Sequence, residues 1–257
     1  MRRGDWALLV AEDGYKLVVR HVGRRVETIR GFVEPSALDS AEYGDVVYTS
    51  LGHKLYVLRP TLYDIAPRLK HATQVIYPPD AEFIALIAGV GPGSKVAEAG
   101  AGSGLLASIL AWRVGPGGQV LSFELRADFA EVAWSNIKAL GLDGVVDLVV
   151  ADVTRLGFGR AEVDAVVLDM GAPWDALGSA LSSLKPGGVV VIFSTTVEHA
   201  QKALSALRNF GVLDVNMAEL SVRPWKPEPG EMRPETRAIS FTGFIIWGRS
   251  PPKQKSQ

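Results

Sequence analysis

The chain has 257 residues, of which 47% are hydrophobic and 21% charged, with no cysteine and a formal net charge of −1 at pH 7. This length suits one large domain or a domain with a smaller annex, and the composition excludes an intrinsically disordered or fibrous protein. The lack of cysteine excludes disulfides, thiolate zinc sites and cysteine nucleophiles. The sequence shows neither a membrane-length apolar run nor a signal-peptide stretch, so we expect a cytoplasmic protein without membrane contact.

The first sixty residues predict a small β domain. Apolar runs at 16–22, 26–33, 45–50 and 54–58 are separated by turn signals such as Asp13-Gly14 and Gly52-His53. A linker over 59–79 follows, in which Pro78 and Pro79 favour extended backbone. We therefore assign residues 1–72 to an N-terminal β domain with its linker.

From residue 80 onward, helical and strand patterns alternate, which is typical of a parallel sheet with right-handed crossovers. Helices are expected at 81–88, 105–114, 128–140, 174–184 and 197–210, and strands at 95–99, 119–124, 145–151, 164–169 and 189–194. Segments 214–222 and 241–247 flank a proline-rich excursion and resemble two antiparallel strands with a long connection. The catalytic domain is thus expected over 73–249, with a disordered tail over 250–257.

Charge is distributed unevenly along the chain. Residues 1–75 carry a net charge of +2, residues 76–200 of −7, and residues 201–257 of +4. Basic flanks around a central site could hold a polyanion by its phosphates, while the acidic centre serves a small ligand. Ordinary scatter of surface charge explains the same numbers equally well. The four histidines form no local zinc motif, so no metal is predicted.

A glycine-rich turn, Glu98-Ala99-Gly100-Ala101-Gly102-Ser103-Gly104-Leu105, connects the first strand of the α/β region to a helix. Glycines there let backbone N–H groups approach a ligand at the positive end of the helix. The G-x-G-x-G spacing fits a pyrophosphate less well than the dinucleotide fingerprint G-x-G-x-x-G does. A tight turn without ligand is the alternative interpretation.

Acidic residues end the next two strands. Glu124 could accept hydrogen bonds from both hydroxyls of a ribose, and Asp152 could accept one from an adenine amino group. A glycine loop and two acids at successive strand ends suit a nucleoside ligand without phosphates, which indicates S-adenosylmethionine (SAM). The negative centre also favours this cation over NAD. Phe129 could contact the nucleoside, although its helical spacing is also typical of a core residue.

The fourth strand ends in Leu168-Asp169-Met170-Gly171-Ala172-Pro173-Trp174. An acid at the carboxyl end of a central parallel strand faces the crevice where such sheets bind ligands. The alternative role for Asp169 is to cap the helix that begins near Pro173.

With these residues, the chain resembles the tRNA adenine-N1 methyltransferases that modify adenine 58 in the T loop, a class I SAM-dependent family. The resemblance extends over nearly the whole chain, and its most specific motif is Thr73-Gln74-Val75-Ile76-Tyr77-Pro78. Other matching segments are Arg59 to Leu62, Glu98 to Gly104, Ser122 to Glu124, Leu168 to Trp174 and Thr242-Gly243-Phe244.

The resemblance implies a Rossmann-like seven-stranded class I methyltransferase sheet with a reversed last strand, a small N-terminal β domain, a homotetramer and tRNA as substrate. It implies Asp169 as the catalytic acid and Tyr77 as a residue near the target adenine. The cofactor-binding residues that follow from it and from the strand ends are Glu98, Gly100, Gly102, Ser103, Gly104, Leu105, Glu124, Phe129, Asp152, Val153 and Asp169.

The chemistry of the acceptor agrees with this assignment. Ring N1 of adenine already carries a lone pair, so methylation needs no covalent enzyme adduct and no cysteine. Asp169 would stabilise the positive charge that develops on the base, which must first leave the tRNA fold. Two alternatives stay open: a SAM-dependent methyltransferase for a protein or small molecule, and a non-catalytic RNA-binding subunit.

Overall fold

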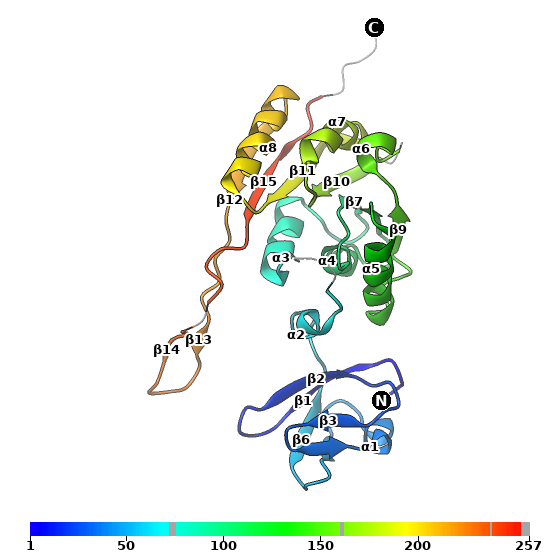
Figure 1. Cartoon of the computed structure of the whole chain (residues 1–257), viewed down its shortest axis with the longest axis vertical. Coiled ribbons are helices and arrows are strands. Elements are labelled where there is room, and N and C mark those ends of the chain that lie inside the picture. Colours follow the sequence, from blue (N-terminus) through cyan, green and yellow to red (C-terminus); the bar gives the residue numbers. More distant parts are fainter. Residues whose placement is uncertain (72–75, 160–161, 237, 253–257) are drawn as a thin grey trace. The chain divides into compact units, whose positions relative to one another are not determined.

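The computed structural model describes residues 1–71, 76–159, 162–236 and 238–252 (Figure 1). The chain divides into two compact units, Met1–Leu69 and Lys70–Gln257. Each unit has a hydrophobic core of its own. Within the described ranges, no helix combines the length and the apolar character needed to cross a membrane.

The first unit is built on a four-stranded antiparallel sheet with the strand order β2-β1-β6-β5. Leu9, Leu38 and Leu55 are fully buried in its core. Its elements are β1 (Trp6–Val10), β2 (Lys16–Arg20), β3 (Val26–Thr28), β4 (Gly31–Val33), α1 (Pro35–Ser40), β5 (Val46–Tyr48), β6 (Lys54–Leu58), α2 (Leu62–Ile65) and the 3-10 turn η1 (Ala66–Arg68).

Several details of this unit differ from the sequence prediction, which contained neither α2 nor η1. Strand β1 and helix α1 were not predicted, although Ala7 and Leu9 alternate inward along β1 as a half-buried strand requires. The segment predicted as one strand over 26–33 is instead the hairpin β3–β4, because the chain reverses at Gly31, whose φ of +92° favours glycine.

The second unit contains the α/β fold. Its elements are α3 (Pro78–Ile87), β7 (Lys95–Ala99), α4 (Leu105–Val114), β8 (Gln119–Glu124), α5 (Ala127–Ala139), β9 (Val146–Val150), α6 (Val153–Leu156), β10 (Val163–Leu168), α7 (Pro173–Ser183), β11 (Leu184–Ser194), α8 (Val197–Asn209), β12 (Leu213–Ala218), β13 (Trp225–Lys226), β14 (Arg233–Pro234) and β15 (Phe244–Arg249).

A seven-stranded sheet with the order β12-β15-β11-β10-β7-β8-β9 forms the centre of this unit. The five strands β11, β10, β7, β8 and β9 are parallel to one another, and β15 is antiparallel to both β11 and β12. Helices α3, α4 and α5 cover one face, and α6, α7 and α8 cover the other (Figure 1). The predicted class I methyltransferase sheet with a reversed last strand is therefore confirmed.

Other local predictions need correction. Pro78 and Pro79 do not continue an extended segment but begin α3, since the first turn of a helix needs no N–H from them. Tyr77, directly before them, is extended. The short helix α6 and the hairpin β13–β14 within the proline-rich excursion were not predicted. Of the tail predicted to be disordered, residues 253–257 lie outside the described ranges.

The parallel strands direct their carboxyl ends to one edge of the sheet. The glycine loop follows β7, Glu124 ends β8, Asp152 follows β9 and Asp169 follows β10. Because neighbouring strands lie about 4.8 Å apart, these residues are brought together although 69 positions separate Gly100 from Asp169.

Candidate functional site

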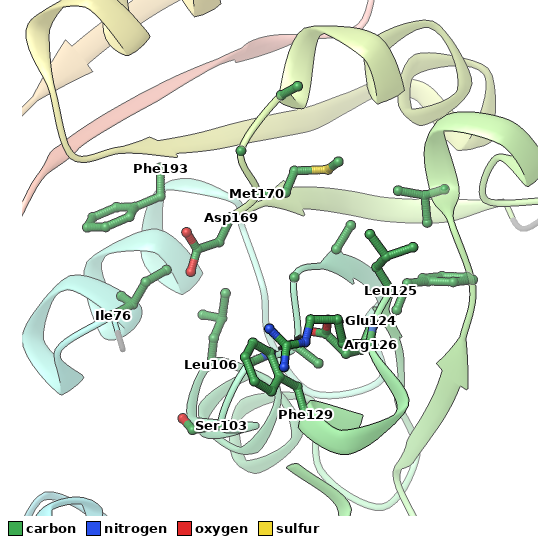
Figure 2. A pocket seen from close by; sticks show the side chains of 18 of the residues that line it. Ile76, Ser103, Leu106, Glu124, Leu125, Arg126, Phe129, Asp169, Met170 and Phe193 are labelled. Atoms are coloured by element: carbon green, nitrogen blue, oxygen red, sulfur yellow. Dashed lines mark hydrogen bonds between the residues drawn. The ribbon is translucent and has the colours of Figure 1, made fainter. Parts of the chain in front are cut away.

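A cavity of about 720 Å³ opens at the carboxyl ends of β7 to β11 (Figure 2). It is lined by most of the residues predicted to bind the cofactor, namely Gly100, Gly102, Ser103, Leu105, Glu124, Phe129, Asp152, Val153 and Asp169. Glu98, Gly104 and Tyr77 are not among its lining residues. No group of three or more His, Asp or Glu residues in the described part of the chain could hold a metal ion.

The glycine loop is folded back onto the neighbouring strand β8. The N–H groups of Gly100 and Ala101 donate to the Phe123 carbonyl at 3.0 and 3.1 Å, and the Gly102 N–H donates to Glu124 Oε2 at 2.9 Å. Gly104 adopts a φ of +75°, and a β-carbon there would lie 3.0 Å from the Ala133 backbone in α5. Glycine at this position thus lets α4 and α5 pack closely.

Glu124 is 7% exposed, and its carboxylate accepts hydrogen bonds from the protein backbone. Besides Gly102, its carboxylate accepts a hydrogen bond from the Arg126 backbone N–H at 3.0 Å. A carboxylate has about four acceptor positions, so two remain for the hydroxyls of a ribose. The two backbone donors fix the direction in which those positions point.

Arg126 is a pocket residue that the sequence did not single out. Its guanidinium lies 3.8 Å from the centroid of the Phe129 ring and is held by the Asp128 carboxylate at 3.1 and 2.6 Å (Figure 2). Phe129 therefore contributes to the cavity wall and is not a core residue. Hydrophobic spacing along a helix indicates only which face is apolar. It does not reveal that a cation stacks on Phe129, so the spacing did not indicate Arg126.

Asp152 combines a structural role with its place in the cavity wall. Its side chain caps α6 by accepting from the Thr154 backbone N–H at 3.0 Å and from the Thr154 hydroxyl at 2.6 Å. The Thr154 hydroxyl is the main reason why the pKa of Asp152 is lowered. An ionised carboxylate at this position remains able to accept from a ligand amino group.

Asp169 does not cap α7, whose N-cap is Ala172 and has no side-chain capping bond. Burial, together with the charge of Glu124, raises the pKa of Asp169 to about 7. Such a shift in a cavity is typical of functional carboxyl groups. Of the two roles considered for Asp169, the structure favours the one in the crevice.

Glu98 lies beneath the cavity wall and is fully buried. The Ser122 hydroxyl donates to its Oε1 at 2.6 Å, whereas Oε2 has no hydrogen-bond partner among the described residues. Burial above all raises the pKa of Glu98 to about 8, and the charges of Asp169 and Glu124 act in the same direction. The predicted contact of Glu98 with the cofactor remains a prediction.

Asn136 of α5 anchors the glycine loop by a hydrogen bond. This 3% exposed amide donates to the carbonyls of Ser103 and Lys70, both at 2.8 Å, and accepts from the Lys70 N–H at 3.0 Å. A polar residue among the apolar positions of α5 was the available sequence signal. Asn136 thereby fixes the carbonyl of a residue that lines the cavity.

The Thr242-Gly243-Phe244 motif supports the other side of the cavity. The Thr242 hydroxyl donates to Asp80 at 3.1 Å, in the first turn of α3. A β-carbon at Gly243 would lie 2.5 Å from the ring of Phe193, which lines the cavity. Gly243 thus leaves room for this ring.

Tyr77 occupies the N-cap position of α3 and is 38% exposed.

The strand order, the glycine loop and the acids at successive strand ends define a class I SAM-dependent methyltransferase. A Thermotoga maritima protein described as a SAM-dependent O-methyltransferase is 31% identical, with a TM-score of 0.91 over 100% of this chain and 96% of that one. A tRNA methyltransferase from Aquifex aeolicus, 24% identical, shares the fold with a TM-score of 0.85 over 98% and 99% of the two chains.

Residues 53–240 match the family described as "tRNA methyltransferase complex GCD14 subunit", and the chain belongs to this family. A Methanocaldococcus jannaschii tRNA (adenine(57)-N(1)/adenine(58)-N(1))-methyltransferase is 30% identical over 96% of both proteins. A Thermus thermophilus tRNA (adenine(58)-N(1))-methyltransferase is 30% identical over 84% of this chain and 85% of its own length. A Cryptococcus neoformans catalytic subunit is 34% identical over 86% of this chain, which spans only 52% of that relative.

The cavity residues fit SAM. Glu124 keeps free acceptor positions for a ribose, and the carboxyl groups of Glu124, Asp152 and Asp169 surround the space with negative potential that suits a cation. The glycine loop brings backbone close to the ligand without side chains in between.

Proposed function

We propose that the protein transfers a methyl group from SAM to N1 of adenine 58 in the T loop of tRNA. The observation that carries this proposal is Asp169, an acid of raised pKa in a cavity whose other end is built for a nucleoside. The M. jannaschii relative, matched over nearly its whole length, supports the choice of substrate. Its name includes adenine 57, which we include as a second possible target base.

Bound SAM supplies an electrophilic methyl group. Glu124 would accept hydrogen bonds from the ribose hydroxyls of bound SAM, and the backbone of the glycine loop, which Asn136 fixes, would approach the cofactor. The ionised Asp169 accepts a hydrogen bond from the exocyclic amino group of the adenine. This contact strengthens as positive charge develops on the ring, so it stabilises the transition state more than the bound substrate. Adenine N1 needs no general base, because its lone pair is free.

The experiment is mass spectrometry of nucleosides after incubation of unmodified tRNA transcript with the protein and SAM. The proposal expects 1-methyladenosine, and its loss when adenine 58 is replaced by guanine. Activity that survives this replacement and disappears when adenine 57 is also replaced would identify the second target. Absence of 1-methyladenosine, with methyl transfer to another acceptor, would favour the protein or small-molecule methyltransferase that the T. maritima neighbour suggests.

Phosphate contacts by the basic flanks belong to the same proposal. Arg24, Arg223 and Arg233 are exposed, which supports such a role. Arg25 is less suited, since it pairs with Glu34 at 3.0 Å and stacks on Phe32 at 3.8 Å. Arg20 donates to the Gly4 carbonyl, and Lys226 pairs with Glu231.

We also propose that the chain acts as a homotetramer. The family's description as a complex subunit supports an assembly. Strand β12 supports one as well, because it is an edge strand of the sheet formed by the described residues and exposes Leu213 by 53% and Met217 by 49%. Light scattering on the purified protein tests this: a mass of four chains supports the proposal, and a monomer at assay concentrations contradicts it.

A further inference from the structure

The cavity has two chemically different ends. One end of the cavity, at the carboxyl ends of β8 and β9, carries the charged side chains of Glu124, Arg126 and Asp152. The lining side chains also include those of Ile76, Phe193, Thr195 and His199, and the His199 ring is hydrogen-bonded to Gly171 and Ser194. Figure 2 shows Ile76 and Phe193 on the same side of the pocket as Asp169, away from Glu124 and Arg126. A cofactor nucleoside suits the first end, so the acceptor must enter at the second.

His199 at this second end has both ring nitrogens occupied. Nε2 lies 2.9 Å from the Gly171 carbonyl, which can only accept, so Nε2 carries the proton. Nδ1 lies 2.8 Å from the Ser194 hydroxyl, which donates to it in the neutral ring. Both ring nitrogens are thus engaged, so only the carbon and π surface of the imidazole remains for a ligand in the cavity.

The orientation of this ring is fixed from several sides. The ring of Trp174 in α7 packs against it with centroids 5.0 Å apart and a tilt of 55°, and Trp174 is not a lining residue of the cavity. The His199 backbone N–H donates to the hydroxyl of Thr196, the N-cap of α8, at 3.2 Å. Such an arrangement holds a flat aromatic surface in place before any ligand arrives, which lowers the entropic cost of binding.

We propose that His199 is the residue on which the acceptor adenine stacks, with Phe193 beside it, while the amino edge of the base faces Asp169. This inference rests on the proposed function and goes further by assigning a binding surface for the flipped base. Base–aromatic stacking tolerates any planar base, so His199 contributes to the affinity for the base, whereas Asp169 determines which of its atoms is methylated.

If His199 had only a structural role, two substitutions would affect the activity in the opposite order from that expected for stacking. His199→Phe keeps a flat ring and loses both hydrogen bonds. His199→Gln keeps an amide donor that can reach the Gly171 carbonyl and loses the ring. Stacking is therefore preserved only in His199→Phe, and the tether to Gly171 only in His199→Gln.

The experiment compares these two full-length variants with the wild type. Each is assayed for kcat/KM with unmodified tRNA transcript, for SAM affinity by calorimetry, and for thermal stability. Trp112→Ala serves as the matched control, because this aromatic residue is 64% exposed on α4 and does not line the cavity. It should leave all three quantities unchanged.

We expect His199→Phe to keep kcat/KM for tRNA within about threefold, and His199→Gln to lower it by about tenfold or more with unchanged SAM affinity. The reverse order, or equal values for the two variants, would overturn the stacking role. A wild-type protein that forms no 1-methyladenosine would overturn the proposed function itself. In an active wild type, only the order of the two variants decides the role of His199.

Discussion

Gly100 and Asp169 are in direct backbone contact: a β-carbon on Gly100 would overlap the carbonyl oxygen of Asp169. The two residues follow the neighbouring strands β7 and β10, and the Asp169 N–H donates to the Ala99 carbonyl at 2.9 Å. The loop predicted to hold SAM and the acid predicted to act on the base are therefore positioned by the same contact.

Gly100→Ala should accordingly displace both the glycine loop and Asp169. Its φ of +92° strains any side chain by about 1–3 kcal/mol, and the overlap with Asp169 adds to this. We expect a lower melting temperature and SAM affinity reduced at least about tenfold. The control is Gly117→Ala, where the backbone has ordinary φ and a β-carbon would meet nothing within 4 Å. Equal effects of the two substitutions would contradict the argument.

The methylation rate should depend on the ionisation of Asp169. Since its pKa is raised to about 7, kcat/KM for tRNA should rise with pH through this region and reach a plateau as the carboxylate forms. Asp169→Asn should remove this pH dependence and lower the single-turnover rate by roughly 10² to 10⁴, with SAM affinity within about tenfold. A variant with near-wild-type turnover would exclude Asp169 as a catalytic residue.

The same carboxyl group should make the fold less stable at high pH. An unfolded aspartate has a pKa of about 3.9, so between pH 4 and 7 the unfolded chain is ionised while the native state keeps the proton. The cost is absent below this window and complete above a pH of about 7. Asp169→Asn should therefore melt at a higher temperature than wild type at pH 8, and the difference should shrink toward pH 5. A difference independent of pH would argue against a raised pKa.

Glu124→Ala should weaken SAM binding by roughly 1.5–3 kcal/mol, because a charged acceptor is lost from the ribose and the Gly102 N–H loses its partner. Affinity for tRNA should stay the same. Calorimetry with each ligand checks both statements. Asp143→Ala removes the same charge from an exposed loop and should change neither affinity. Parallel losses for both ligands would indicate misfolding instead.

Binding of tRNA should fall steeply with salt, with a log-log slope of about −0.7 to −0.9 per phosphate contacted. Arg24→Ala and Arg223→Ala should each make the slope shallower by roughly one unit. Arg25→Ala is the internal comparison and should have a smaller effect, because its guanidinium is engaged with Glu34 and Phe32. SAM affinity should respond little to salt. A wild-type tRNA affinity that is insensitive to salt would remove the support for a polyanion surface.

The order of the α/β elements could be predicted from sequence because β7 to β10 and residues 189–194 of β11 are short, mostly apolar runs between helical patterns. Strand β11 itself begins earlier than predicted, at Leu184. The elements that were missed are short or weakly patterned. Helix α6 has four residues and follows directly after its cap, Asp152. The prolines at 78 and 79 are compatible with either an extended segment or a helix start, and only the packing of α3 distinguishes the two.

At the site, the glycine loop, Glu124, Asp152 and Asp169 could be located from the sequence, since the carboxyl ends of parallel strands must meet at one edge. That Glu98 lies beneath the cavity and that Arg126 covers Phe129 became clear from the folded chain. The tertiary structure also decided that His199 turns its nitrogens to Gly171 and Ser194. The physical reason is that local spacing sets which face of an element is apolar. The partner of a side chain on that face depends on contacts between residues far apart in the chain.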